Sequence, residues 1–101
     1  MGAKVMRGKH RAFVFVDVNP GKEKKVAEEL LKNNEVVEVH MITGEYDILT
    51  VLEFELYAKQ IFTSFQETAS TFVLDKIRKL GYVQDTKTII PSHSLSKADF
   101  V

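Results

Sequence analysis

The segment Thr43-Gly44-Glu45-Tyr46-Asp47 joins two runs of alternating apolar residues, 36–42 and 48–54. Because glycine adopts backbone conformations that other residues avoid, this segment predicts the corner of a β-hairpin. A turn needs only the glycine and one or two small polar residues. The tyrosine and the second carboxylate exceed what the turn requires. They are therefore the first candidates for recognition of a ligand.

The pattern on either side of this hairpin alternates between strand and helix. Residues 12–18 are mostly valine and phenylalanine, as in a strand, and a turn follows at 19–21. Apolar residues then recur at helical spacing over 22–32 and, after the hairpin, over 58–80. Residues 82–90 read as the last strand, which Pro91 ends. The predicted order of elements is βαββαβ.

This order, with its central hairpin, is typical of a ferredoxin-like α+β fold. Right-handed crossovers place both helices on one face of the antiparallel sheet, so the other face should be polar. It is not, because Phe13 and Phe15 alternate with valines in the first strand, as Leu49 does with Ile48 in the third. In the second strand we expect Val36 and Ile42 on one side. The opposite side would then carry Val37, Val39 and Met41.

Strands that are apolar on both faces are covered on both faces. Exposure of about five large apolar side chains would forgo roughly 10 kcal/mol, at about 2 kcal/mol each, and a patch of this size marks an interaction site. We therefore expect a second copy of the chain to pack on this face about a two-fold axis, which gives a dimeric α/β barrel. The alternative is that the C-terminal tail folds back as a cover.

The length of 101 residues suits one domain, which we place at 11–91, between a flexible N-terminal segment at 1–10 and a tail at 92–101. Fourteen basic and fourteen acidic residues give no net charge, which argues against direct specific DNA binding and against binding to a membrane. The chain has no cysteine and no run of about 18 apolar residues. These features favour a cytoplasmic protein.

Residues 11–90 resemble the effector domain of the Lrp/AsnC regulators, known as the RAM domain. The resemblance rests on segments 12–16, 20–22, 26–30 and 36–39, on the corner 43–48, and on Thr86-Lys87-Thr88-Ile89-Ile90. Lrp/AsnC regulators usually carry a helix-turn-helix domain before this one. Because only residues 1–11 precede the first strand, we expect a stand-alone RAM domain. The second helical region is also longer than is usual in the family.

The resemblance implies dimers and larger rings that bind amino acids between dimers, at the glycine corner. Carried over by match, the ligand-binding positions are Gly44, Tyr46, Asp47, Thr86 and Thr88. Asp47 would accept hydrogen bonds from the ligand's ammonium group, and backbone N–H groups around Gly44 would hold its carboxylate. Tyr46 would supply an apolar wall with a polar tip. The implied partners are further copies of the chain, an amino-acid-like effector and full-length Lrp/AsnC regulators.

The same residues also have simpler interpretations. Asp47 would cap the turn by bonding backbone N–H groups, Tyr46 would pack at the rim of a dimer, and the two threonines would serve only as good strand formers. Asp17 and Glu53, inside apolar strands, are either partnered edge charges or a buried pair.

Two other functional classes share this strand order: small oxygenase-like enzymes that form dimeric α/β barrels, and ACT-like regulatory subunits. The enzymes need a cluster of His, Asn or Trp inside the barrel, whereas the interior candidates here are mostly Val, Phe, Leu and Met. The glycine corner favours RAM over ACT. His10, His40 and His93 lack metal-ligand spacing. We therefore predict a binding module with no catalytic residues, no metal and no cofactor.

Overall fold

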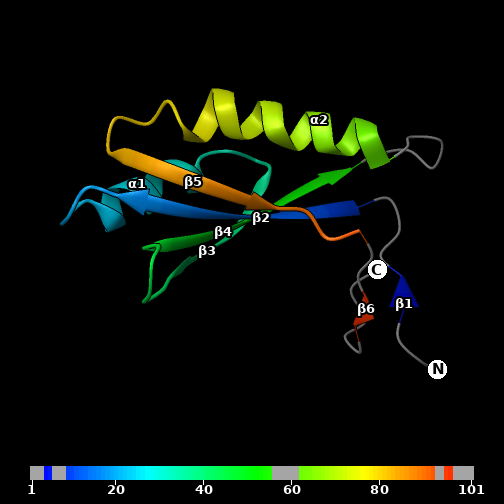
Figure 1. Cartoon of the computed structure of the whole chain (residues 1–101), viewed down its shortest axis with the longest axis horizontal. Coiled ribbons are helices and arrows are strands. Elements are labelled where there is room, and N and C mark those ends of the chain that lie inside the picture. Colours follow the sequence, from blue (N-terminus) through cyan, green and yellow to red (C-terminus); the bar gives the residue numbers. More distant parts are fainter. Residues whose placement is uncertain (1–3, 6–8, 56–61, 93–94, 97–101) are drawn as a thin grey trace.

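The computed structural model describes residues 4–5, 9–55, 62–92 and 95–96. Its main sheet is antiparallel, with strand order β3-β4-β2-β5, and both long helices lie on one face of it (Figure 1). The predicted ferredoxin-like α+β fold is therefore confirmed. The strands of this sheet are β2 (Lys9–Val18), β3 (Val36–Met41), β4 (Ile48–Glu55) and β5 (Val83–Ile89). The helices are α1 (Glu23–Leu31) and α2 (Phe62–Phe72), which continues into the π-helix η1 (Val73–Ile77).

Helix α1 follows β2 through a tight turn at Gly21, whose φ of 82° is a conformation that favours glycine. The helix buries Val26, Ala27 and Leu30, which share one face at helical spacing. It ends where the side-chain amide of Asn33 donates a hydrogen bond to the Leu30 carbonyl at 3.2 Å. The amphipathic pattern of this segment thus becomes one buried stripe against the sheet.

The second helical region combines two helix types. Its buried residues, among them Phe65, Ala69 and Ile77, face the sheet. In η1 the Arg78 N–H donates to the Val73 carbonyl, five residues earlier, at 2.9 Å, which is the bond of a π-turn. Periodicity over 58–80 had predicted one continuous helix, and its first part, 58–61, lies outside the described residues. No helix in the described part of the chain is both long and apolar enough to span a membrane.

Alternate residues of β2, β4 and β5 line the two faces of the sheet, as predicted. On the helix-covered face, Val14 and Val16 of β2 are completely buried, and so are Ile48 and Leu52 of β4. We call the other side the open face. Its apolar centre is formed by β2, β4 and β5, with Phe13 directly between Val51 and Ile89. The open face consists of Arg11, Phe13, Phe15, Asp17, Glu38, His40, Leu49, Val51, Glu53, Asp85, Lys87 and Ile89.

Strand β3 differs from the sequence-based expectation. The pairing of β3 with β4 shifts between Val36 and Glu38, so Val37 is the extra residue of a β-bulge. As a result Val39 pairs with buried Thr50 and packs against the core, on the same side as Val36. Met41 pairs with buried Ile48 on this same side. The prediction that Val39 and Met41 lie opposite Val36 is therefore wrong. On the open face β3 presents polar side chains instead. Among them, Nε2 of His40 lies 2.8 Å from Oε1 of Glu38, within hydrogen-bond distance.

The described parts of the two termini pair with each other. β1 (Lys4–Val5) and β6 (Leu95–Ser96) form a separate two-stranded antiparallel sheet, away from α2 (Figure 1). The remainder of the predicted N-terminal segment up to residue 8, and most of the predicted tail, lie outside the described residues.

Candidate functional site

The corner between β3 and β4 has the conformation that its glycine predicts. Gly44 has a φ of 131°, in the region that L side chains avoid. A Cβ added there would meet no atom within 4 Å, so the backbone conformation requires the glycine and crowding does not. The Ile42 N–H donates to the Asp47 carbonyl at 3.0 Å and closes the hairpin.

Asp47 ties this corner to the end of β2. Its backbone N–H donates to the Val16 carbonyl at 3.1 Å. Its carboxylate oxygen Oδ2 accepts a hydrogen bond from the Val18 N–H at 3.0 Å. The carboxylate therefore bonds a backbone N–H on a strand 29 positions away, and not one within the turn, as a turn cap would. Its second oxygen keeps further acceptor capacity.

Several acidic groups meet beside the corner on the open face. The hydrogen bond from the side chain of Asp17 to Asp47, partial burial, and the negative charges of Asp47 and Asp85 raise the pKa of Asp17 above its usual value. Asp85 lies directly across from Asp17 in the sheet. Burial raises the pKa of Tyr46, and the charges of Asp85, Glu45 and Asp17 raise it further. Several carboxyl groups thus lie close together at this end of the open face.

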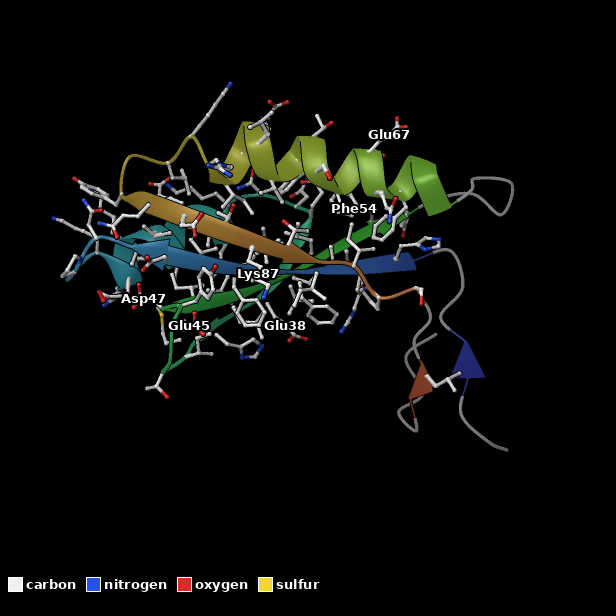
Figure 2. All side chains as sticks on the ribbon, in the orientation of Figure 1. Glu38, Glu45, Asp47, Phe54, Glu67 and Lys87 are labelled. Carbon is white, nitrogen blue, oxygen red and sulfur yellow. The ribbon has the colours of Figure 1, made fainter. Side chains whose placement is uncertain are left out.

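A hollow of about 260 Å³ lies between the corner and β5. Its apolar wall includes the rings of Phe15 and Tyr46, whose centroids are 5.7 Å apart. Glu45 and Lys87 supply its charged groups, and both lie on the side of the sheet away from α2 (Figure 2). The complete lining is Phe15, Ile42, Thr43, Glu45, Tyr46 and Lys87. An apolar wall with a few charged groups is what a site for a small polar ligand requires.

Comparison with known proteins shows which family has this architecture. The family model of the Lrp/AsnC ligand binding domain matches residues 11–98. The chain belongs to the Lrp/AsnC family. The predicted resemblance to the effector domain of these regulators is therefore confirmed.

The relatives of this Lrp/AsnC domain include transcriptional regulators. The HTH-type transcriptional regulator FL11 of Pyrococcus horikoshii is 37% identical over 79 residues, which are 78% of this chain and 46% of the regulator. The chain thus spans less than half the length of the curated relatives it matches.

Solved structures share the fold. The crystal structure of FFRP-DM1 is 30% identical, with a TM-score of 0.65 over 81% of this chain and 97% of that one. The complex of the transcriptional regulator NMB0573 of Neisseria meningitidis with L-Met is 26% identical, with a TM-score of 0.61 over 90% of this chain and 53% of that one.

Within this Lrp/AsnC domain, the predicted site residues fall into two groups. Gly44, Tyr46 and Asp47 lie together at the corner, next to the hollow. Thr86 and Thr88 share one face of β5, as expected, but they pair with Val16 and Val14 and so lie on the helix-covered face. The structure therefore does not bring the threonines to this hollow.

Sequence reasoning missed Lys87, the residue of β5 that lines the hollow. The signal was present in the alternation of the strand. If the two threonines point to one side, the lysine between them points to the other, beside Phe15. The family resemblance directed attention to the threonines and away from this position.

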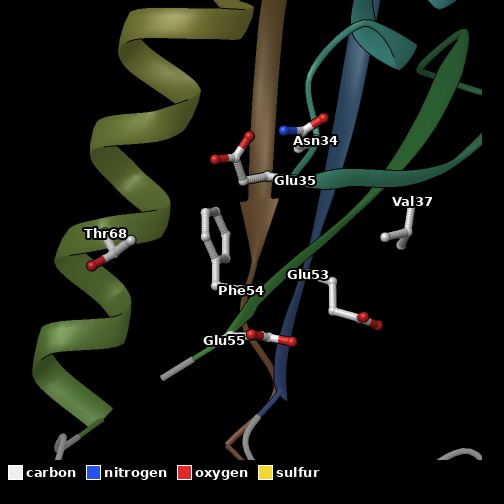
Figure 3. Close-up of a pocket in the computed structure, with 7 residues that line it drawn as sticks. All are labelled: Asn34, Glu35, Val37, Glu53, Phe54, Glu55 and Thr68. Carbon is white, nitrogen blue, oxygen red and sulfur yellow. The ribbon is translucent and has the colours of Figure 1, made fainter. Parts of the chain in front are cut away.

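A second hollow, of about 450 Å³, lies between α2, the start of β3 and the end of β4 (Figure 3). Its lining is strongly acidic, with Glu35, Glu53 and Glu55. Glu53 also pairs with Arg11 at 2.9 Å, so Glu53 and Asp17 each have a separate partner and do not form a pair. In the described ranges no group of three or more His, Cys, Asp or Glu residues has a geometry that could hold a metal ion. The corner hollow, which combines apolar and oppositely charged groups, is the stronger candidate.

Proposed function

We propose that this Lrp/AsnC domain binds an amino-acid-like effector beside the β3–β4 corner and assembles through its open face. Through that assembly it acts in transcriptional or metabolic regulation. The observation that carries the proposal is the position of the hollow, which opens on the apolar face that the helices leave uncovered. A second copy packed on this face would help to enclose the ligand. The related Neisseria regulator in complex with L-Met supports an amino acid as effector.

The open face has the chemistry of an interface between copies. Phe13 and Phe15 are only half-buried, and Ile89 is 43% exposed, although each lies near the centre of an apolar patch. Covering such side chains stabilises an assembly by about 2 kcal/mol each. The ion pair of Arg11 with Glu53 and the polar pair of Glu38 with His40 border the patch, as polar groups do at the rim of an interface. The expected product is a dimeric α/β barrel, which associates further into larger rings.

A regulatory role is favoured over an enzymatic one because the relatives are transcriptional regulators. The balanced charge of the chain favours an indirect role at DNA. Mixed assembly with full-length Lrp/AsnC regulators would supply that role, because their effector domains would offer the same kind of open face.

Sedimentation velocity tests the assembly. We expect the wild type to be a dimer or larger at micromolar concentration. Phe13→Glu places a carboxylate at the centre of the patch, and desolvating two such charges per two-fold interface should raise the dissociation constant at least about a hundredfold. Leu74→Glu is the matched control, because Leu74 is 60% exposed on η1, on the opposite side of the sheet. A wild type that stays monomeric would refute the assembly.

Calorimetry of the wild type with each standard amino acid tests the effector. Binding of at least one amino acid with a dissociation constant in the micromolar to millimolar range is expected. If none binds to the assembled protein, the proposed function is wrong.

A further inference from the structure

The corner hollow carries opposite charges on its two sides. Lys87 comes from β5, an edge strand, and Glu45 comes from the corner between β3 and β4. Phe15 of β2 lies between them, directly across from Lys87. The hollow therefore offers a cation and an anion separated by an aromatic surface.

The charges of Lys87 and Glu45 are available to a ligand in this hollow. The Asp47 carboxylate bonds the Val18 N–H and the side chain of Asp17, so its role is to position the corner. Within the described part of the structure, neither Glu45 nor Lys87 forms a salt bridge. A free α-amino acid carries an ammonium and a carboxylate on one carbon, and it matches such a pair of charges.

We infer that Lys87 binds the α-carboxylate of the effector, that Glu45 binds its α-ammonium group, and that Phe15, Ile42 and Tyr46 enclose its side chain. The ligand class that follows is an α-amino acid with an apolar or aromatic side chain. This inference rests on the proposed function and refines it.

The surroundings support this class. At about 260 Å³ the hollow is smaller than the roughly 300–1,000 Å³ of sites for drug-sized molecules, and it suits a single amino acid. The side chains of aspartate or glutamate would meet the negative charges of Asp17 and Asp85. An apolar side chain would instead gain from burial against the aromatic wall.

The test is calorimetry of the assembled protein with L-Met, L-Phe, L-Lys and L-Glu. The wild type should bind L-Met or L-Phe at least tenfold more tightly than L-Glu and L-Lys. Lys87→Met should weaken binding of L-Met tenfold to hundredfold, the range for loss of a hydrogen bond to a charged group. Lys24→Met, on the outer side of α1, is the matched control and should change nothing.

Two ligand analogues assign the individual contacts. L-Methioninamide lacks the carboxylate, so Lys87→Met should not weaken its binding further. N-acetyl-L-methionine lacks the ammonium group, so Glu45→Gln should not weaken its binding, although it weakens that of L-Met. Sedimentation of each variant verifies that the assembly is intact.

The outcomes separate the two proposals. If the wild type binds an amino acid and Lys87→Met binds it equally well, the role of Lys87 is wrong and the proposed function stands. If the wild type binds only amino acids with charged side chains, the ligand class is wrong. If it binds no amino acid, the proposed function fails together with this inference.

Discussion

The two faces of the sheet differ in how completely one chain covers them. On β2, Val14 and Val16 point toward the helices and are 0% exposed, whereas Phe13 and Phe15, one position away, are only half-buried. The covered face holds almost only apolar groups. The open face mixes an apolar centre with carboxylates, Lys87 and the corner hollow.

This difference shows where a single chain completes its own structure. The covered face is already packed, so its residues contribute to folding. The open face still has apolar area to bury, and the hollow at its edge has two charged groups, Glu45 and Lys87, that form no salt bridge within the described residues. Its residues are therefore available for assembly and for a ligand. Substitutions on the two faces should therefore affect different measurements.

The largest expected effect compares two leucines of β4, one on each face of the sheet. Leu52→Ala removes a completely buried side chain from the covered face and should lower the free energy of unfolding by about 2–5 kcal/mol. Leu49→Ala, on the open face, should act mainly by raising the dissociation constant of the dimer. Denaturant unfolding and sedimentation measure the two quantities. An equally large loss from Leu49→Ala without weaker association would show that the open face is covered within one chain.

The corner that carries the hollow depends on the backbone of Gly44. Gly44→Ala should destabilise the fold by about 1–2 kcal/mol, because alanine is strained at a φ of 131° although no atom crowds its Cβ. Gly81→Ala is the control, since Gly81 also has open space and is not among the glycines with positive φ. Thermal unfolding compares the two. Equal effects would mean that the corner tolerates other conformations.

Among the described residues, Thr50 is the one buried polar side chain. Thr50 is completely buried, and its Oγ1 has no hydrogen-bond partner among the described residues. Thr50→Val keeps the shape and removes the unpaired hydroxyl, so it should stabilise the protein by about 1 kcal/mol. Thr88→Val, half-buried on the same face, should change stability by less than about 0.5 kcal/mol. A loss of stability in Thr50→Val would show that the hydroxyl is bonded.

The smallest effect concerns charge on the open face. The hydrogen bond to Asp47, partial burial and nearby negative charges raise the pKa of Asp17 above 3.8. A carboxyl group with a raised pKa in the folded state destabilises the fold once it is ionised. The penalty is absent well below pH 3.8 and appears as the pH rises through the folded-state pKa of Asp17.

Asp17→Asn should therefore raise the melting temperature at neutral pH, and the gain should disappear in acid below pH 3.8. Glu67→Gln, on the exposed side of α2, should show no such pH dependence. Melting curves of both variants across this pH range measure the difference. If the gain in melting temperature is the same at every pH, ionisation of Asp17 does not destabilise the folded state.

Much of the architecture could be predicted from local patterns. The alternation of Val14 and Val16 with Phe13 and Phe15 predicted two apolar faces, and the period of α1 predicted its buried stripe. The corner was found because glycine with a positive φ is a local requirement. The site was predicted less well, since Lys87 reaches the hollow only through the pairing of β5 with β2.

The sequence by itself determined the order of elements, the corner and the two-sided character of the strands, because propensity and periodicity act within a few neighbouring residues. Only the tertiary structure decided the bulge at Val37, the π-turn in η1 and the bond between Asp47 and Val18. The bulge depends on the pairing of β3 with β4, and the Asp47–Val18 bond joins residues 29 positions apart. The π-turn joins residues only five positions apart, but the period of the apolar residues does not distinguish it from an α-helical turn. The energy of such contacts exceeds the local preferences that a sequence pattern records.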